Sequence, residues 1–166
     1  MARDRARFKG RGGNGHFAQV PHAVTEHPEF ISLSAYAKAL LFAFFPQLRF
    51  DKDGIANNGD LCATWSEVQR YGWRSKDTLA KALRELERAE VLIRTRQGDR
   101  HRCSLFAISW LPINDCRTKD GLRKLDVPPT KVPPVNWYRK LCPVTRGTAA
   151  PPHGAPEQKV SSGRAA

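Results

Sequence analysis

The stretch from Thr64 to Trp110 constrains the fold most, because it orders a helical pattern, a tight turn, a second helical pattern and two strand patterns. Its first four residues have the spacing of a capping box, in which the Thr64 hydroxyl and the Glu67 carboxylate bond to free backbone N–H groups at a helix start. We expect this helix to end at Gly72, since glycine readily adopts the left-handed conformation that closes many helices.

A second helix is expected from Lys76 to about Ala89, with Ser75 as its N-cap. Its apolar residues recur at helical spacing and predict one buried stripe: Leu79, Ala82, Leu83 and Leu86. The opposite face is mostly cationic: Asp77, Lys81, Arg84 and Arg88. Such a helix can pack on a core with one side and offer positive charge to a partner with the other.

Two strand patterns follow this helix directly. Residues 91–96 are β-branched and apolar and then alternate, residues 97–101 are typical of a turn, and residues 103–110 form a second strand pattern. Basic side chains gather around the turn: Arg94, Arg96, Arg100, His101 and Arg102. A basic hairpin after a basic helix can place cations on both sides of a groove lined by phosphates.

An apolar helix is expected before this stretch, capped by Ser32 or Ser34 and closed near Pro46. Its apolar residues are predicted to lie in the core: Leu33, Tyr36, Ala37, Leu40, Leu41, Phe44 and Phe45. We expect residues 17–30 to be a connecting segment and residues 47–60 a loop, from which Ile55 to Asn57 adds a short third strand to the hairpin.

Four short segments of this chain stand out: Asn57-Asn58-Gly59-Asp60-Leu61, Tyr71-Gly72-Trp73-Arg74-Ser75, Leu83-Arg84-Glu85-Leu86-Glu87 and Thr95-Arg96-Gln97-Gly98. Together they resemble a group of winged helix-turn-helix proteins encoded by bacterial prophages and plasmids. The resemblance covers about Phe17 to Asn114. It implies a mainly α fold with a small β-hairpin wing (α+β), and some members resemble the N-terminal domains of phage replication proteins or plasmid replication initiators.

The bulk properties favour a nucleic-acid partner. The chain has 166 residues and a formal net charge of +12, so one domain of ordinary size fits with basic ends to spare. No apolar run is long enough to span a membrane, and no secretory signal is expected. The four cysteines lack close pairing and are interpreted as reduced thiols in a bacterial cytoplasm, near the nucleoid.

We divide the chain into a flexible basic arm (1–16), a winged-helix domain (17–114) and a Pro-rich, basic, largely disordered tail (115–166). The arm contains a G-x-G-x-x-G match, but no strand precedes it, so a dinucleotide site is not expected. Order is expected to end near Pro112 and Asn114. Trp137-Tyr138 is expected to dock back on the domain, with a protein partner or a stacked base as alternatives.

No catalytic site, metal or cofactor is expected. His101-Arg102-Cys103 and Cys116 lack the paired spacing of a zinc site, and Asp51, Asp53 and Asp60 lie on one loop without a second acidic motif. The histidines outside the hairpin have no recognisable base or nucleophile partner.

The predicted function is binding of double-stranded DNA, with the second helix in the major groove and the hairpin on adjacent phosphates. The predicted DNA-binding residues are Arg74, Ser75, Lys76, Thr78, Lys81, Arg84, Arg96, Arg100, His101 and Arg102. The core beneath them is predicted from Trp65, Leu79, Leu83, Leu86, Leu92, Leu105 and Ile108. The first hypothesis is that the protein is a transcriptional regulator of a mobile element. A replication accessory or initiator, a winged helix that binds only proteins, and an RNA-binding variant are alternatives, and a homodimer and a monomer both remain open.

Overall fold

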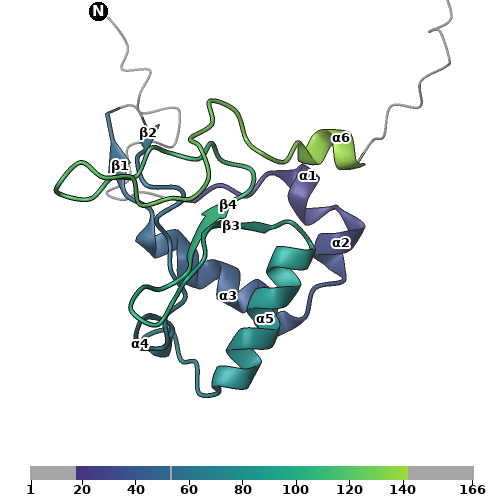
Figure 1. Cartoon of the computed structure of the whole chain (residues 1–166). Helices are drawn as coiled ribbons and strands as arrows, with labels where there is room; N and C mark the ends of the chain where they lie inside the picture. The colour runs from purple at the N-terminus through teal and green to yellow at the C-terminus, as the bar shows by residue number, and fades with distance from the viewer. Residues whose placement is uncertain (1–17, 53, 142–166) are drawn as a thin grey trace, which may run out of the picture.

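The computed structural model describes residues 18–52 and 54–141, which form helices around a small antiparallel hairpin (Figure 1). The fold is therefore α+β. The elements in chain order are α1 (His22–Thr25), α2 (Pro28–Ile31), α3 (Ala35–Phe44), the 3₁₀ turn η2 (Phe45–Gln47), β1 (Phe50–Asp51), β2 (Gly54–Ile55), α4 (Trp65–Gln69), α5 (Lys76–Arg88), β3 (Leu92–Arg96), β4 (Leu105–Ile108) and α6 (Trp137–Leu141). No helix in these ranges is long and apolar enough to cross a membrane. The predicted basic arm and residues 142–166 lie outside the described residues.

Helix α3 forms as the sequence predicts. Ser34 is its N-cap, with its hydroxyl accepting a hydrogen bond from the Ala37 N–H at 3.1 Å, and Pro46 lies in η2 just beyond its end. The prediction that Tyr36 lies in the core is wrong. Tyr36 is 63% exposed, because the buried face of α3 is centred on Ala37, Leu40, Leu41 and Phe44. The segment before α3 is also more regular than expected, since α1 and α2 occupy part of it.

Helices α4 and α5 and the turn between them follow the predicted order. Gly72 has a φ of +84° and closes the turn after α4, and Ser75 caps α5 by accepting from the Thr78 N–H at 3.3 Å. The predicted capping box is wrong. The Thr64 hydroxyl lies 3.4 Å from the Ser66 hydroxyl instead of bonding to a backbone N–H, and the Glu67 carboxylate pairs with Arg70 at 3.3 Å.

Strands β3 and β4 form the predicted hairpin, with Leu92 opposite Ile108 and an irregularity between Arg94 and Arg96. The predicted third strand is misplaced. Ile55 belongs to β2, which pairs with β1, whereas Leu61 forms an isolated antiparallel bridge to Phe106 with N–O distances of 2.8 and 3.3 Å. The hairpin therefore receives its additional backbone contact at Leu61, four residues beyond the end of the predicted strand.

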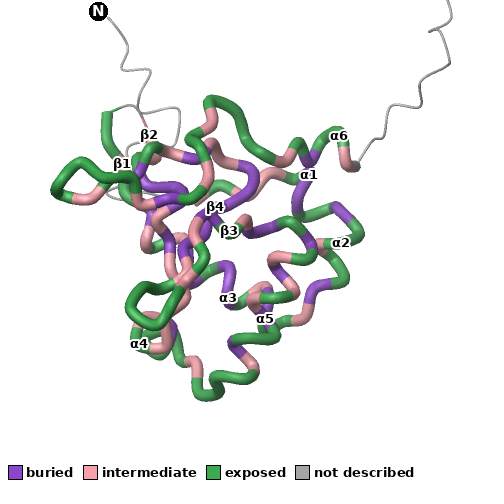
Figure 2. The backbone as a smooth tube through the Cα atoms, viewed as in Figure 1, coloured by how far each residue is buried: buried purple, intermediate pink, exposed green. Residues whose placement is uncertain are grey.

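The core lies between α3, α5 and the hairpin, and buried stretches surround β3 and β4 at the centre of the molecule (Figure 2). Five predicted core residues are buried, namely Leu79, Leu86, Leu92, Leu105 and Ile108, while Trp65 and Leu83 are half-buried at its edge. A carboxylate reinforces the contact of the two helices. Glu85 on α5 accepts from the Ser34 N–H at 3.1 Å, and the hydrogen bonds from Ser34 lower the pKa of Glu85 below its usual range.

A buried asparagine joins the loop before α4 to the segment after β4. The Asn58 side chain is fully buried, and its amide donates to the carbonyls of Ile108, Leu111 and Pro112 at 3.0–3.1 Å while its oxygen accepts from the Ile108 N–H at 2.8 Å. The Asn58 N–H donates to the Asn114 side-chain oxygen at 2.8 Å, and the Asn114 N–H donates to the Asn58 carbonyl at 2.9 Å. One residue thus satisfies backbone groups that would otherwise be buried without partners.

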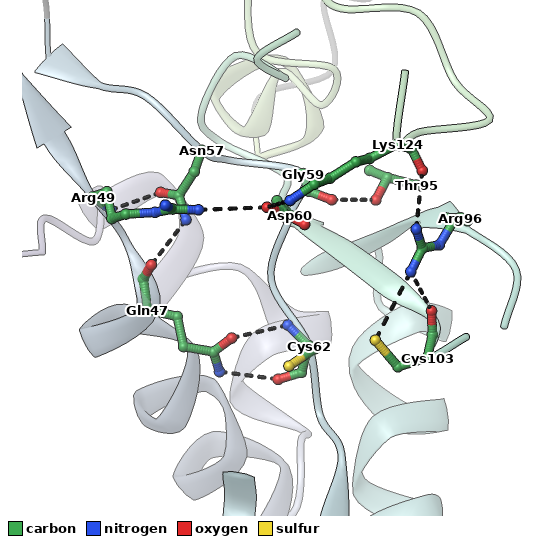
Figure 3. A network of polar contacts seen from close by, with 10 residues as sticks. All are labelled: Gln47, Arg49, Asn57, Gly59, Asp60, Cys62, Thr95, Arg96, Cys103 and Lys124. Carbon is green, nitrogen blue, oxygen red and sulfur yellow. Dashed lines mark hydrogen bonds and ion pairs between the residues drawn. The ribbon is translucent and has the colours of Figure 1, made fainter. Parts of the chain in front are cut away.

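Neighbouring polar side chains extend this junction toward α3 (Figure 3). Gln47 both accepts from the Cys62 N–H and donates to the Cys62 carbonyl at 2.9 Å, and Asn57 donates to the Gln47 carbonyl at 2.9 Å. The Thr95 hydroxyl of β3 donates to the Gly59 carbonyl at 2.6 Å. The end of α3, the loop before α4 and the hairpin are therefore fixed relative to one another by hydrogen bonds as well as by apolar packing.

The ordered part continues well beyond Asn114, contrary to expectation. Ile113, Cys116 and Leu125 are buried against Leu105 and Ala107, in a second apolar cluster on the other side of the hairpin. The packing depends on contacts between distant residues, which a composition rich in proline and basic residues did not reveal. We call residues 112–141 the extension.

The prediction that Trp137 docks back on the domain is confirmed. Its ring is 2% exposed, its indole N–H donates to the Ser109 hydroxyl at 3.0 Å, and it meets His27 edge-on with centroids 5.2 Å apart. Tyr138, by contrast, points to solvent with 69% of its surface exposed.

Replacing Asn58 with alanine should lower the free energy of unfolding by about 3 kcal/mol, because the Ile108 N–H and buried carbonyls lose their partner. Asn136→Ala is the matched control, since its exposed side chain accepts one hydrogen bond, from the Arg139 N–H, and should contribute about 1 kcal/mol or less. Urea unfolding followed by tryptophan fluorescence measures both. Equal losses in the two variants would contradict a central role for Asn58.

Candidate nucleic-acid interface

The outer face of α5 carries cations that project into solvent. Lys81 and Arg84 are exposed on this face, and Arg74 is exposed in the turn before the helix. Lys76, the first residue of α5, lies over the Trp65 ring of α4 with its ammonium 5.7 Å from the ring centroid. The Arg84 side chain folds back to donate from Nε to the Ala80 carbonyl at 3.1 Å, which leaves its two terminal nitrogens available.

Ser75 and Thr78 have different surroundings from the cations. The Ser75 hydroxyl is already used as the N-cap of α5, and Thr78 is half-buried beside the turn. Both lie at the N-terminal end of α5, where the free backbone N–H groups and the helix dipole favour negative charge.

The loop between β3 and β4, residues 97–104, is called the tip loop. The Asp99 carboxylate accepts from the N–H groups of His101 and Arg102 at 2.7 and 2.9 Å, and the Asp99 N–H donates to the Arg102 carbonyl. The His101 hydrogen bond is the largest cause that holds the pKa of Asp99 below its usual range, so this carboxylate is ionised at neutral pH. The turn that it closes leaves Arg100, His101 and Arg102 exposed.

Arg94 and Arg96 of β3 are both engaged by other groups of the protein. Arg94 forms a two-pronged ion pair with Glu87 of α5, both distances being 2.8 Å. Arg96 donates to the Lys124 carbonyl at 3.4 Å and to the Cys103 carbonyl at 3.0 Å, and its buried Nε has no partner in the described part of the chain (Figure 3). The Arg96 guanidinium is therefore held by two backbone carbonyls, one of them in the extension.

The remaining predicted cations form no ion pairs in the described part of the chain, although the charge of Arg102 also acts on the Asp99 carboxylate of the tip loop. Within residues 18–52 and 54–141, no ion pair is formed by Arg74, Lys76, Lys81, Arg84, Arg100 or Arg102. In the view of Figure 1, the N-terminal end of α5 lies at the bottom of the molecule, and the tip loop lies in the left part of the molecule, above α4. One cationic segment is therefore helical and the other lies in a loop.

The described residues contain no group of three or more His, Cys, Asp and Glu side chains arranged to hold a metal ion. Burial raises the pKa of the Cys62 and Cys116 thiols, which keeps them protonated at neutral pH. Neither cysteine has the lowered pKa that a reactive thiolate requires.

One feature of this region was missed from the sequence. Tyr36, Tyr71 and Trp73 line a hollow of about 350 Å³ that Arg74, Ser75 and Thr78 also border. The signal was present, because Tyr71-Gly72-Trp73 places two aromatic residues in a tight turn beside Arg74.

Comparison with known proteins finds no match to this chain among family models, curated proteins or solved structures.

Arg96→Ala should lower the free energy of unfolding by about 2 kcal/mol, because two carbonyls lose a charged donor. Arg100→Ala removes the same side chain from an exposed position and should change stability by no more than about 0.5 kcal/mol. Thermal and urea unfolding of the two variants test the distinction. If Arg96→Ala unfolds like the parent protein and like Arg100→Ala, Arg96 is a free surface cation after all.

Proposed function

We propose that this protein binds double-stranded DNA as a winged helix, with α5 in the major groove and the tip loop on the phosphates beside it. The order of elements supports this proposal: α3, the Leu61 bridge, α4, α5 and the β3–β4 hairpin follow one another as in the winged helix-turn-helix pattern. The observation that carries it is the set of unpaired cations on α5 and the tip loop. A cation that is not held in an ion pair is available for phosphate, and each phosphate contact releases counterions from DNA.

The proposed contacts divide into two kinds. Lys81 and Arg84 lie on the exposed face of α5 and are suited to base edges in the major groove, where arginine and lysine bond to guanine. Arg100, His101 and Arg102 lie on the tip loop and are suited to phosphates. Arg74, Lys76 and the N-terminal end of α5 fit a phosphate at the edge of the groove.

The biological role that requires the fewest further features is that of a transcriptional regulator of a mobile element, because it needs only this DNA-binding surface. A replication accessory or initiator is the second candidate, since it would use the same surface at an origin and also bind a protein partner. Tyr138 and Val132 favour keeping this candidate, because both are apolar and about 69% exposed on the extension. Trp137 is buried and does not belong to such a partner surface.

Binding to duplex DNA of random sequence across a salt series tests the proposal, followed by selection of the bound sequences. A steep loss of affinity with salt and an enriched motif are expected. A palindromic motif would favour a regulator, and tandem repeats an origin. Absence of binding at physiological salt would contradict the proposal and leave a protein-binding module.

Two double variants separate the proposed contacts. Lys81→Ala with Arg84→Ala should weaken binding to the selected motif far more than to random DNA, because base contacts carry the discrimination. Arg100→Ala with Arg102→Ala should weaken binding to all sequences alike and reduce the magnitude of the salt slope by about 2, near 1 for each lost phosphate contact.

Lys119→Ala with Lys131→Ala is the control, because it removes the same charge from exposed lysines of the extension. It should leave both the discrimination and the slope almost unchanged. If all three double variants lose the same affinity for DNA, net charge alone drives binding and the assigned face is wrong.

A further inference from the structure

The hollow between α3 and the turn before α5 combines flat apolar surfaces with positive charge. Tyr36 comes from α3, and Tyr71 and Trp73 from the turn, with the Tyr36 and Trp73 ring centroids 6.3 Å apart and their planes inclined by 54°. Its volume of about 350 Å³ lies within the range of small-ligand sites. None of the described residues that line it is acidic.

Two of the three aromatic rings are accessible to solvent. Tyr36 is 63% exposed and Tyr71 is 41% exposed, whereas Trp73 is half-buried against the apolar core. Arg74 is exposed at the rim and forms no ion pair in the described part of the chain. A ligand that fits this combination has a flat apolar face joined to an anion, as a nucleotide does.

We propose that this hollow binds an unpaired base of a DNA strand that continues from the duplex held by α5. The inference rests on the proposed function, because Arg74, Ser75 and Thr78 border both the hollow and the proposed duplex surface. Bases inside a duplex are stacked on one another and present only their edges. The rings can therefore stack only on a base at an overhang or fork, while Arg74 contacts the phosphate attached to it.

A second copy of the chain is the other occupant to consider. The formal net charge of +12 opposes it, since a partner protomer would bring further cations toward Arg74, whereas a nucleotide brings a compensating negative charge. The protein is thus expected to prefer a junction of double-stranded and single-stranded DNA over a blunt duplex of the same sequence.

Fluorescence anisotropy with the full chain tests this preference. The probes are a blunt duplex and the same duplex with a short thymidine overhang on either strand. The overhang should increase affinity about fivefold or more, as expected for stacking of a base on aromatic side chains. Tyr36→Leu and Tyr71→Leu should abolish the gain and leave affinity for the blunt duplex unchanged.

Phe42→Leu is the matched control. Phe42 lies on the same helix as Tyr36 and is 65% exposed, yet it does not border the hollow. It should retain the full preference for the overhang. A 2-aminopurine base at the junction gives a second readout, because its fluorescence should change on stacking with the parent protein and with Phe42→Leu but not with Tyr36→Leu.

The outcomes separate this inference from the function on which it rests. Equal affinity for blunt and overhanging duplexes would overturn the base site while duplex binding stands. Loss of binding to every DNA would overturn both. If Tyr36→Leu weakens binding to blunt and overhanging DNA equally, or converts a dimer to a monomer in sedimentation without DNA, the hollow is not a base site.

Discussion

The buried amide of Asn58 is the interaction on which the arrangement of the structure depends. It bonds to the backbone at the end of β4 and at the start of the extension, so the loop before α4 cannot move without breaking several buried hydrogen bonds. Gln47 and Thr95 tie the same loop to α3 and β3. Because α4 and α5 follow this loop, the geometry of the helix pair relative to the hairpin is set at a polar junction inside an otherwise apolar core.

The basic residues around this junction are of two kinds: some are held in contacts within the protein, and others remain exposed and could bind a partner. Arg94 pairs with Glu87 of α5, and Arg96 donates to carbonyls of Cys103 and of Lys124 in the extension. The Lys124 ammonium in turn pairs with Asp60 at 2.7 Å. The formal net charge therefore overstates the charge that a partner could use. What remains on α5 and the tip loop is a smaller set of exposed side chains, carried by a helix and a loop that the core holds in place. That set supports DNA binding more specifically than composition does.

Local signals in the sequence predicted the local structure well. The Ser34 and Ser75 caps, the glycine turn after α4 and the stripe along α5 depend on residues within one or two helical turns, and all are present. Two local predictions failed, the capping box of Thr64 and Glu67 and the burial of Tyr36. The other predictions that failed depend on distant partners. Packing of the extension needs Leu125 to meet the hairpin. Arg96 is held by the nearby Cys103 carbonyl at 3.0 Å and also by the Lys124 carbonyl at 3.4 Å, which lies 28 residues away in sequence. No periodicity within β3 could have revealed that contact.

Hydrogen–deuterium exchange of the whole protein with and without duplex DNA tests the central claim most directly, because it locates the bound surface without assuming it. Slower exchange should appear in the N-terminal half of α5, in the turn that contains Arg74 and in the tip loop. The extension around Lys119 and Lys131 should exchange as it does in the free protein. Protection concentrated in the extension, with α5 and the tip loop unchanged, would contradict DNA binding by this face.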